Sequence, residues 1–157
     1  MPWGKVPTVW GTFYARWEGE EILALRFPGD FREPSSSDSP LLERLSRELN
    51  EYFCGERAKF SVPVRLEGPP FFRAVWAELL RIPYGERVAY GELARRVGRP
   101  TAARAVGQAL AKNPVPILIP CHRVVGKNTL GGFGPGLSWK ERLLSLEVAH
   151  KAKFSPR

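Results

Sequence analysis

Cys121 and His122 are neighbours in the sequence, and this pair has the clearest capacity for chemistry in the chain. A thiolate is the nucleophilic form of cysteine, and an imidazole beside it can accept the thiol proton. The approach to the pair is stiff, because Pro114, Pro116 and Pro120 precede it closely. We interpret Cys121 as an activated nucleophile. The alternative interpretation is a buried structural cysteine beside a hydrogen-bonded histidine.

An acid is also needed to fix the tautomer of the imidazole. Side chains of neighbouring residues on an extended backbone point to opposite sides, so a bond between the pair needs a turn or one intervening water. The spacing predicts a helix over Trp139–Glu147 that could pack behind the pair. Glu147 is the first candidate for the acid; Glu141, about a turn and a half away, is the rival. A solvated helix charge is the alternative interpretation of Glu147.

A glycine-rich segment at 126–136 (GKNTLGGFGPG) follows the pair and can bring its backbone close to a ligand. It is not a phosphate-binding loop, because no Gly-Lys-Ser/Thr follows at the required spacing and no strand precedes it. Metal chemistry is not expected either. The soft ligands have no paired spacing, and they are limited to Cys54, Cys121, His122 and His150.

The composition predicts a folded protein, with 43% hydrophobic residues among 157. No apolar run approaches the roughly 20 residues that a membrane span needs. No secretory signal is visible, and two cysteines cannot form a disulfide scaffold, so we expect a cytoplasmic protein, associated with the nucleoid if it is prokaryotic. Residues 1–70 carry 9 basic and 11 acidic residues, whereas residues 71–157 carry 15 and 5. This asymmetry favours a polyanionic partner for the second half; surface charge that only aids solubility is the alternative.

The first half is predicted to be a small α/β unit of hairpin, helix and strand. The segments rich in β-branched and aromatic residues predict strands, and leucines at helical spacing predict a helix capped by Asp38 or Ser39. In order, the elements are strands at Thr8–Trp17 and Ile22–Phe27 joined by a turn at Glu18–Glu21, a loop at Arg32–Pro40, a helix at Leu41–Phe53 and a strand at Phe60–Val64.

The second half is predicted to be mainly helical, and Pro69-Pro70 marks the boundary before it. The apolar spacing indicates helices at Phe72–Arg81, Tyr90–Val97 and Ala102–Lys112, the last with Thr101 as its N-cap. Two short helices joined by a tight turn that contains glycine are typical of a helix-turn-helix, in which the second helix enters a DNA groove.

Four stretches of this half together form a distinctive pattern. The sequence PCHRVV at 120–125 is preceded by Asn113-Pro114 and followed by Lys140-Glu141 and Glu147. Upstream lie IPYG at 82–85, YGELA at 90–94 and RAVG at 104–107. With this spacing, residues 71–147 resemble the O6-alkylguanine-DNA alkyltransferases, also called methylated-DNA–protein-cysteine methyltransferases. The first half resembles the variable N-terminal domain of that family only in outline.

The resemblance implies a ribonuclease H-like α/β domain at 1–68 and a mainly helical domain with a winged helix-turn-helix at 69–157. It implies direct-reversal repair of double-stranded DNA that contains O6-alkylguanine, with O4-alkylthymine as a second candidate substrate. The alkyl group would pass irreversibly to Cys121 after the nucleotide is flipped out, once per molecule. A monomer that needs no cofactor and no membrane is expected.

The resemblance also implies roles for single residues. His122 would take the thiol proton through a water, Glu147 would orient His122, and Asn113 would brace the turn. Tyr90 would bond the extruded base and help to rotate the phosphate, and Arg104 would replace the flipped base in the stack; a plain phosphate contact is the alternative for Arg104. Further DNA contacts are expected at Thr101, Ala103, Ala105, Gly107 and Arg123, and a base pocket at Tyr90, Pro116, Cys121, Val124, Phe133 and Gly134.

The sequence departs from the family in the glycine-rich segment. Gly134 aligns with a serine of some members, Phe133 with a frequent tyrosine, and Pro135 with a glycine. Two other functions compete with transfer. A lesion sensor would bind alkylguanine without changing the mass of Cys121, and a winged-helix regulator would bind undamaged DNA by sequence and be indifferent to alkylation.

Overall fold

A computed structural model describes residues 3–30 and 39–154, and the chain forms two compact units, residues 1–66 and residues 67–157. The first unit combines a small antiparallel sheet with a helix, and the second is mainly helical. The division falls between Leu66 and Glu67, just before Pro69-Pro70. No helix in the described ranges is long and apolar enough to cross a membrane.

The sheet of the first unit has three strands in the order β1-β2-β3, namely β1 (Trp3–Thr8), β2 (Gly11–Glu18) and β3 (Glu21–Arg26). The prediction of one strand over Thr8–Trp17 is wrong, because the chain reverses at Val9-Trp10. The Thr8 hydroxyl bonds the Gly11 carbonyl at 2.7 Å, and Gly11 has a φ of 119°, a conformation that favours glycine. The predicted turn between β2 and β3 is confirmed.

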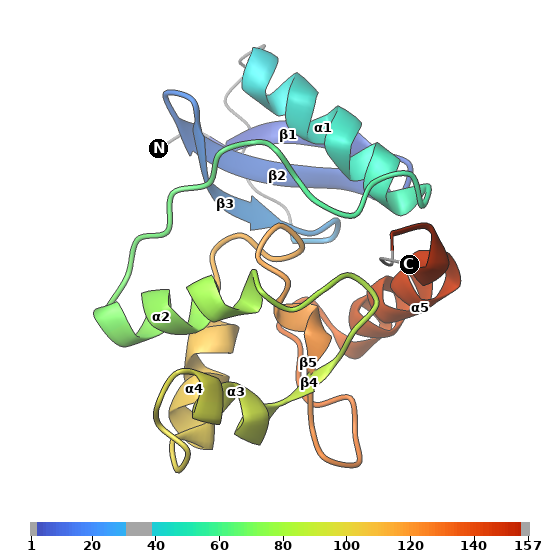
Figure 1. Cartoon of the computed structure of the whole chain (residues 1–157). Helices are drawn as coiled ribbons and strands as arrows, with labels where there is room; N and C mark the ends of the chain where they lie inside the picture. The colour runs from blue at the N-terminus through green and yellow to red at the C-terminus, as the bar shows by residue number, and fades with distance from the viewer. Residues whose placement is uncertain (1–2, 31–38, 155–157) are drawn as a thin grey trace. The chain divides into compact units, whose positions relative to one another are not determined.

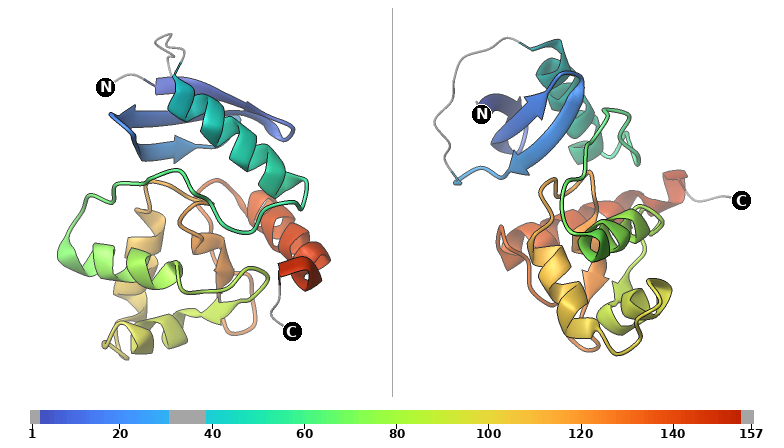
Figure 2. Two further views of the ribbon diagram at one scale, coloured as in Figure 1. Left: turned by 45° about the horizontal axis from the view of Figure 1, so that its top comes forward. Right: turned by 90° about the vertical axis from the view of Figure 1, so that its left-hand side faces the viewer.

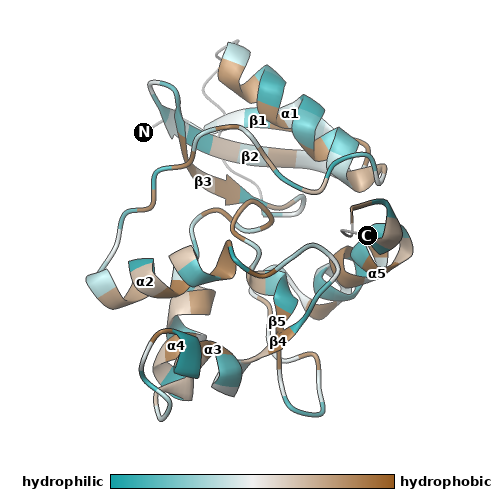
Figure 3. Ribbon diagram, viewed as in Figure 1, coloured by the Kyte–Doolittle hydropathy of each residue, from teal (hydrophilic) through white to brown (hydrophobic). Residues whose placement is uncertain are grey.

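Helix α1 (Pro40–Phe53) covers the sheet of this unit (Figures 1 and 2). Hydrophobic and polar residues alternate along it (Figure 3), and its leucines face the buried side, as predicted. Ser39 caps the helix by accepting a bond from the Leu42 N–H at 3.4 Å. Asp38, the other candidate cap, and most of the predicted Arg32–Pro40 loop lie outside the described residues.

The segment after α1 is held by a carboxylate and by one backbone bridge to β3. Only Val64 forms a bridge, with Ile22 of β3, so the strand predicted over Phe60–Val64 is absent there. Glu48 of α1 is 1% exposed and accepts bonds from the Ser61 amide at 2.8 Å and from the Ser61 hydroxyl. Burial alone would raise the pKa of Glu48, but these bonds and the Arg57 charge lower it.

In the second unit, the buried Trp76 side chain joins two helices. This side chain is 2% exposed, and its indole N–H donates to the Ala109 carbonyl at 2.8 Å. Two short parallel strands pair Val88 with Val124. In order, the elements are α2 (Pro70–Leu79), β4 (Val88–Ala89), α3 (Tyr90–Arg96), α4 (Ala103–Ala111), η1 (Cys121–Arg123), β5 (Val124–Val125) and α5 (Leu137–Phe154).

Helices α3 and α4 form the predicted helix pair, and the turn between them includes Gly98 at a φ of 79°. The predicted cap at Thr101 is wrong: α4 begins after Ala102, which makes no side-chain capping bond, and Thr101 is exposed. The predicted Trp139–Glu147 helix is present but continues to Phe154 as part of α5.

Candidate active site

Cys121 begins η1, one turn of 3-10 helix that follows Pro120. Its amide donates to the Ile119 carbonyl at 2.8 Å, and the Arg123 amide donates to the Pro120 carbonyl at 3.1 Å. With about three residues per turn, successive side chains of a 3-10 helix point in different directions. Cys121 therefore faces a pocket, whereas His122 faces α5.

The loop before η1 is strained and braced. Ile117 has a φ of 76°, in the left-handed region that β-branched residues rarely adopt, and it is 2% exposed. Asn113 secures the loop with two bonds: its amide donates to the Ile119 carbonyl at 2.8 Å, and its side-chain oxygen accepts from the Val115 amide at 3.0 Å. Strain of this kind persists only where surrounding contacts enforce it, and here it fixes the turn that carries Cys121.

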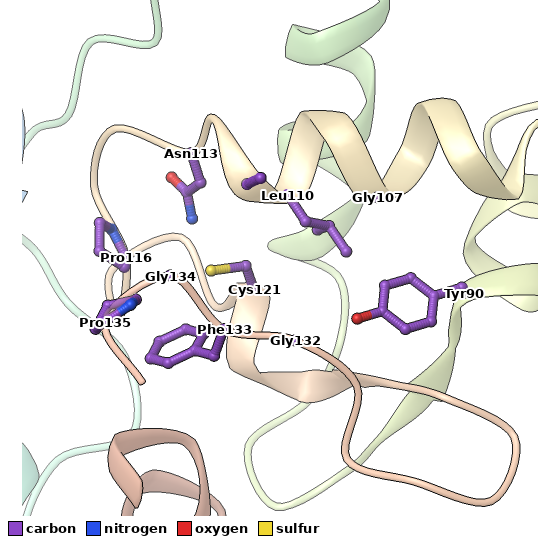
Figure 4. A pocket seen from close by; sticks show the side chains of 11 residues that line it. Tyr90, Gly107, Leu110, Asn113, Pro116, Cys121, Gly132, Phe133, Gly134 and Pro135 are labelled. Atoms are coloured by element: carbon purple, nitrogen blue, oxygen red, sulfur yellow. The ribbon is translucent and has the colours of Figure 1, made fainter. Parts of the chain in front are cut away.

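The pocket beside Cys121 has a volume of about 190 Å³. Figure 4 shows the Cys121 sulfur directed toward the Asn113 side chain, with the Phe133 ring close by and the Tyr90 hydroxyl directed into the pocket. Gly131 touches Tyr90, because a Cβ at Gly131 would lie 2.4 Å from the tyrosine oxygen. The lining consists of Tyr90, Gly107, Leu110, Ala111, Asn113, Pro116, Cys121, Gly132, Phe133, Gly134 and Pro135.

Glu147 of α5 holds His122 from the side opposite the pocket. Its carboxylate bonds the His122 Nε2 at 2.8 Å and takes two bonds from Arg123, at 2.9 Å each. The Gly85 amide adds a fourth donor at 3.1 Å. Glu147 is 0% exposed, whereas Glu141 is exposed, so the structure selects Glu147 of the two candidates.

These contacts determine the protonation states of Glu147 and His122. Burial alone would raise the pKa of Glu147, but His122 and Arg123 outweigh burial and hold that pKa well below its usual value. Burial lowers the pKa of His122, so the imidazole is neutral and donates from Nε2 to the carboxylate. Its Nδ1 makes no hydrogen bond to any described protein group and is therefore an acceptor.

Burial raises the pKa of Cys121 to about 11, against smaller opposite effects of the Asn113 side chain and the Lys140 charge. The resting residue is therefore a thiol, only 7% exposed, and a poor target for adventitious electrophiles. The chemistry open to this arrangement is nucleophilic attack by sulfur on a ligand in the pocket, with His122 as the proton acceptor.

Most residues predicted for the site come together here, and two need correction. Arg123 does not offer its guanidinium to DNA, since it is 7% exposed and bound to Glu147 and to the Ile82 carbonyl at 2.7 Å. Val124 is buried outside the pocket lining, and its carbonyl accepts from Lys140. Of the predicted DNA contacts, Gly107 lines the pocket, while Thr101, Ala103 and Arg104 are exposed and Ala105 is half-buried on α4.

Lys140 belongs to the pattern that carries the resemblance, but sequence reasoning assigned it no role; it is 0% exposed and donates to backbone carbonyls beside the pocket. It lies seven residues before Glu147, on the same face of α5, and this spacing is the signal that could have revealed it. Sequence reasoning also missed Leu110, Ala111, Gly132 and Pro135 as pocket-lining residues, because their types carry no chemical signal. Among the described residues, no group of three or more histidine, cysteine or acidic side chains could hold a metal.

The chain matches known proteins over both units. The profile described as the 6-O-methylguanine DNA methyltransferase, DNA binding domain, matches residues 70–149. The constitutive methylated-DNA–protein-cysteine methyltransferase of Bacillus subtilis is 47% identical over 119 residues, which are 74% of this chain and 72% of that protein. The methylated-DNA–protein-cysteine methyltransferase of Mycobacterium tuberculosis is 50% identical over 134 residues, 82% of this chain and 81% of that protein.

Solved structures agree with these matches. The crystal structure of Mycobacterium tuberculosis OGT in complex with DNA has a TM-score of 0.85 and 38% identity, covering 94% of this chain and 93% of that one. The crystal structure of O6-methylguanine methyltransferase from the same organism gives the same score and identity over 99% of this chain and 94% of that one. The α/β architecture with a small antiparallel sheet is therefore shared with solved proteins.

Proposed function

Because the chain belongs to the family of 6-O-methylguanine DNA methyltransferases, we propose that it repairs alkylated DNA by direct reversal, moving the alkyl group from the guanine O6 to Cys121. One observation carries this proposal. A buried thiol faces a small pocket, and the neighbouring imidazole is held by Glu147 with its acceptor nitrogen unbonded. This is the arrangement of nucleophile, base and orienting acid that transfer to sulfur requires.

The step balances without a cofactor. Sγ of Cys121 attacks the alkyl carbon, the carbon–O6 bond breaks, and its electron pair goes to the guanine. The thiol proton passes to Nδ1 of His122 through a water. The Tyr90 hydroxyl, which points into the pocket, donates its proton to the departing guanine and regains one from solvent, to which His122 later returns its own. The product is a thioether, which water does not cleave, so each molecule acts once.

The raised pKa of Cys121 fits a protein that reacts once. A thiolate exposed at rest would be consumed by oxidants or other electrophiles before a lesion arrived. Proton removal is useful only when the base fills the pocket and excludes solvent. The buried thiol and the neutral His122 thus keep the nucleophile latent until substrate binds.

We assign DNA contact to α3 and α4, a helix-turn-helix that, with the short β4–β5 pair, has the elements of a winged helix. The exposed start of α4 carries Ala103 and Arg104, followed by Ala105 and Gly107, and small side chains permit close approach to a groove. The guanine must leave the stack to reach Cys121, and Arg104 fills the gap. The substrate is double-stranded DNA in the cytoplasm, bound by one copy of the chain, whose first unit we interpret as a ribonuclease H-like domain.

The test measures transfer of a labelled methyl group from an O6-methylguanine duplex to protein. Cys121→Ala is expected to abolish transfer and to retain DNA binding, whereas Cys54→Ser, which changes the exposed second cysteine, retains both. Transfer by Cys121→Ala would refute the assignment. Lesion-selective binding by the wild-type protein without transfer would identify a sensor instead.

The assignment of Arg104 has its own test. Arg104→Ala is expected to slow repair of a duplex lesion at least about tenfold while changing the reaction with free O6-benzylguanine little, because only the duplex requires flipping. Equal losses with both substrates would exclude a role in flipping. The exposed Arg81→Ala serves as the control for loss of one surface charge.

A further inference from the structure

Helix α5 buries a second charged side chain besides Glu147. Lys140 is 0% exposed and shares the inner face of the helix with the apolar Leu143 and Leu144. Lysine is almost never fully buried without a compensating interaction, because loss of hydration makes a buried ammonium costly. The contacts of Lys140 therefore indicate what compensates for this cost.

The ammonium of Lys140 connects two segments of the site. It donates to the Val124 carbonyl at 2.7 Å and to the Gly132 carbonyl at 3.1 Å. Val124 follows the turn that carries Cys121. Gly132 belongs to the glycine-rich wall of the pocket, by which we mean the lining residues Gly132, Phe133, Gly134 and Pro135. Lys140 thus ties the glycine-rich wall to the strand that continues from the nucleophile.

The space beside the glycines of this segment is uneven. Gly131 contacts Tyr90, whereas a Cβ at Gly132 or at Gly134 would meet no atom within 4 Å. A hydrogen bond to a charged donor in a buried setting is stronger than one between neutral groups. The bond from Lys140 to the Gly132 carbonyl therefore helps to fix the wall relative to Cys121.

The same ammonium also acts on the nucleophile by charge. Among the groups facing Cys121, the Asn113 side chain and the Lys140 cation favour the thiolate, and both oppose burial. Burial lowers the pKa of Lys140, Cys121 raises it, and the cation of Arg87 lowers it. The groups that face His122 on the other side are Glu147, Arg123 and Lys140. Lys140 is thus the cation that acts on both members of the pair.

We propose that Lys140 is a positioning residue for alkyl transfer: its buried ammonium fixes the glycine-rich wall of the pocket and stabilises the Cys121 thiolate as it forms. This inference rests on the proposed function, since it assigns Lys140 a part in the same reaction. It predicts two separable effects, one on the fit of the alkyl group and one on the pH dependence of transfer.

The experiment compares Lys140→Met with Lys140→Arg, using Lys59→Met, which changes an exposed lysine of the first unit, as the control. The rate with free O6-benzylguanine is measured from pH 6.5 to 9.5, and rates with O6-methylguanine and O6-benzylguanine are compared at one pH. Loss of the charge is expected to move the pH profile of Lys140→Met upward by about one unit, which is about tenfold in rate on the rising part of the profile. The benzyl-to-methyl ratio is expected to change at least about threefold as the wall moves.

The conservative variant separates charge from packing. Lys140→Arg keeps the cation, so its pH profile is expected to stay with the wild type even if its rate is lower. Rates are expressed per active molecule, so a merely structural role would lower the active fraction and leave the profile and the ratio unchanged. A wild-type profile and ratio in Lys140→Met would overturn the inference. A wild-type protein without any transfer would instead overturn the proposed function.

A second measurement uses only the wild-type protein, so it does not depend on whether a Lys140 variant folds. The side-chain nitrogen resonances of Lys140 and of the control Lys59 are followed by nuclear magnetic resonance in the wild-type protein before and after alkylation of Cys121. The Lys140 resonance is expected to shift, because the alkyl group enters the pocket whose lining residue Gly132 accepts a hydrogen bond from Lys140, whereas Lys59 stays in place. An unchanged Lys140 resonance would overturn the inference.

Discussion

Each unit contains a buried glutamate whose carboxylate is held by hydrogen bonds, and the two glutamates differ in function. Glu48 is 1% exposed and Glu147 is 0% exposed, and each accepts bonds from backbone amides and arginine. Both carboxyl groups have pKa values below the usual range, because hydrogen bonds and charges outweigh burial. By burial and charge alone, the two sites are hard to tell apart.

The difference lies in the partner that each carboxylate orients. Glu48 binds Ser61, and this bond pins the segment after α1 to the helix. Glu147 binds His122, whose second ring nitrogen makes no hydrogen bond to a described protein group. A hydrogen-bonded network without an open position stabilises structure, whereas one that ends in an unsatisfied acceptor beside a thiol can receive a proton. The open position, not the buried charge, marks the reactive site.

The largest expected effect comes from exchanging each glutamate for its amide. Glu147→Gln is expected to slow alkyl transfer about 100-fold or more, because the amide cannot stabilise a positively charged His122. Glu48→Gln is expected to cost about 1–3 kcal/mol of unfolding free energy and to leave the transfer rate per folded molecule unchanged. Transfer assays and urea denaturation of both variants make the comparison. A transfer defect in Glu48→Gln as large as that of Glu147→Gln would erase the distinction.

An effect of intermediate size is expected from alanine substitutions at two glycines whose φ lies in the left-handed region, Gly131 and Gly19. Gly131→Ala is expected to slow transfer about 10-fold to 100-fold, because its Cβ would lie 2.4 Å from the Tyr90 oxygen and displace it. Gly19 between β2 and β3 has a φ of 59° and open space around it. Gly19→Ala is therefore expected to cost only about 1–2 kcal/mol in stability from backbone strain. Equal transfer rates for the two variants, measured at a temperature where both are folded, would contradict the placement of Tyr90.

The smallest expected effect is a difference in pH dependence. In the folded chain the pKa of His122 is lowered from 6.5 by burial. Below pH 6.5, His122 is therefore protonated in the unfolded chain and stays neutral in the folded chain. Stability is then expected to fall from about pH 6.5 downward, by at most about 1.4 kcal/mol per pH unit. The lowered pKa values of Glu48 and Glu147 add stability that is complete above pH 4.5 and is lost below it. Urea denaturation between pH 7.5 and 5 measures the slope.

His122→Gln is the matched variant for this slope, because glutamine does not titrate and keeps an amide donor for Glu147. The free energy of unfolding of this variant is expected to change less between pH 7.5 and 5 than that of the wild type. Identical slopes in the two proteins would mean that His122 has the same pKa in the folded and unfolded chains. This result would contradict the assignment of His122 as a neutral base.

The elements that the sequence predicted well are those with strong local signals. The leucine spacing of α1 and its Ser39 cap are examples, and so is the helix pair α3–α4. The hairpin at Val9-Trp10 was missed because a β-branched and an aromatic residue read as continued strand, and only Gly11 indicated the turn. The strand expected before Val64 was not formed because the backbone amide of Ser61 binds Glu48, a tertiary contact that no local pattern encodes.

The residues of the site also fall into those that local sequence predicts and those that depend on tertiary contacts. The adjacency of Cys121 and His122 and the prolines before them were sufficient to predict a nucleophile and a base. Spacing left Glu147 and Glu141 as rivals, and burial against His122 separated them. Arg123 and Lys140 were misplaced or missed because cationic side chains are normally exposed. Their burial follows from the charge of Glu147 and from carbonyls that only the folded chain brings near.

The most direct test of the account is a mass spectrum of tryptic peptides after the protein is mixed with an O6-methylguanine duplex. The peptide Asn113–Arg123 (NPVPILIPCHR) contains Cys121, and the peptide Glu48–Arg57 (ELNEYFCGER) contains Cys54 as an internal control. One added methyl group is expected on the first peptide and none on the second, and the reaction is expected to end at one equivalent. Unmodified Cys121 in protein that binds the lesion tightly would contradict transfer to this residue.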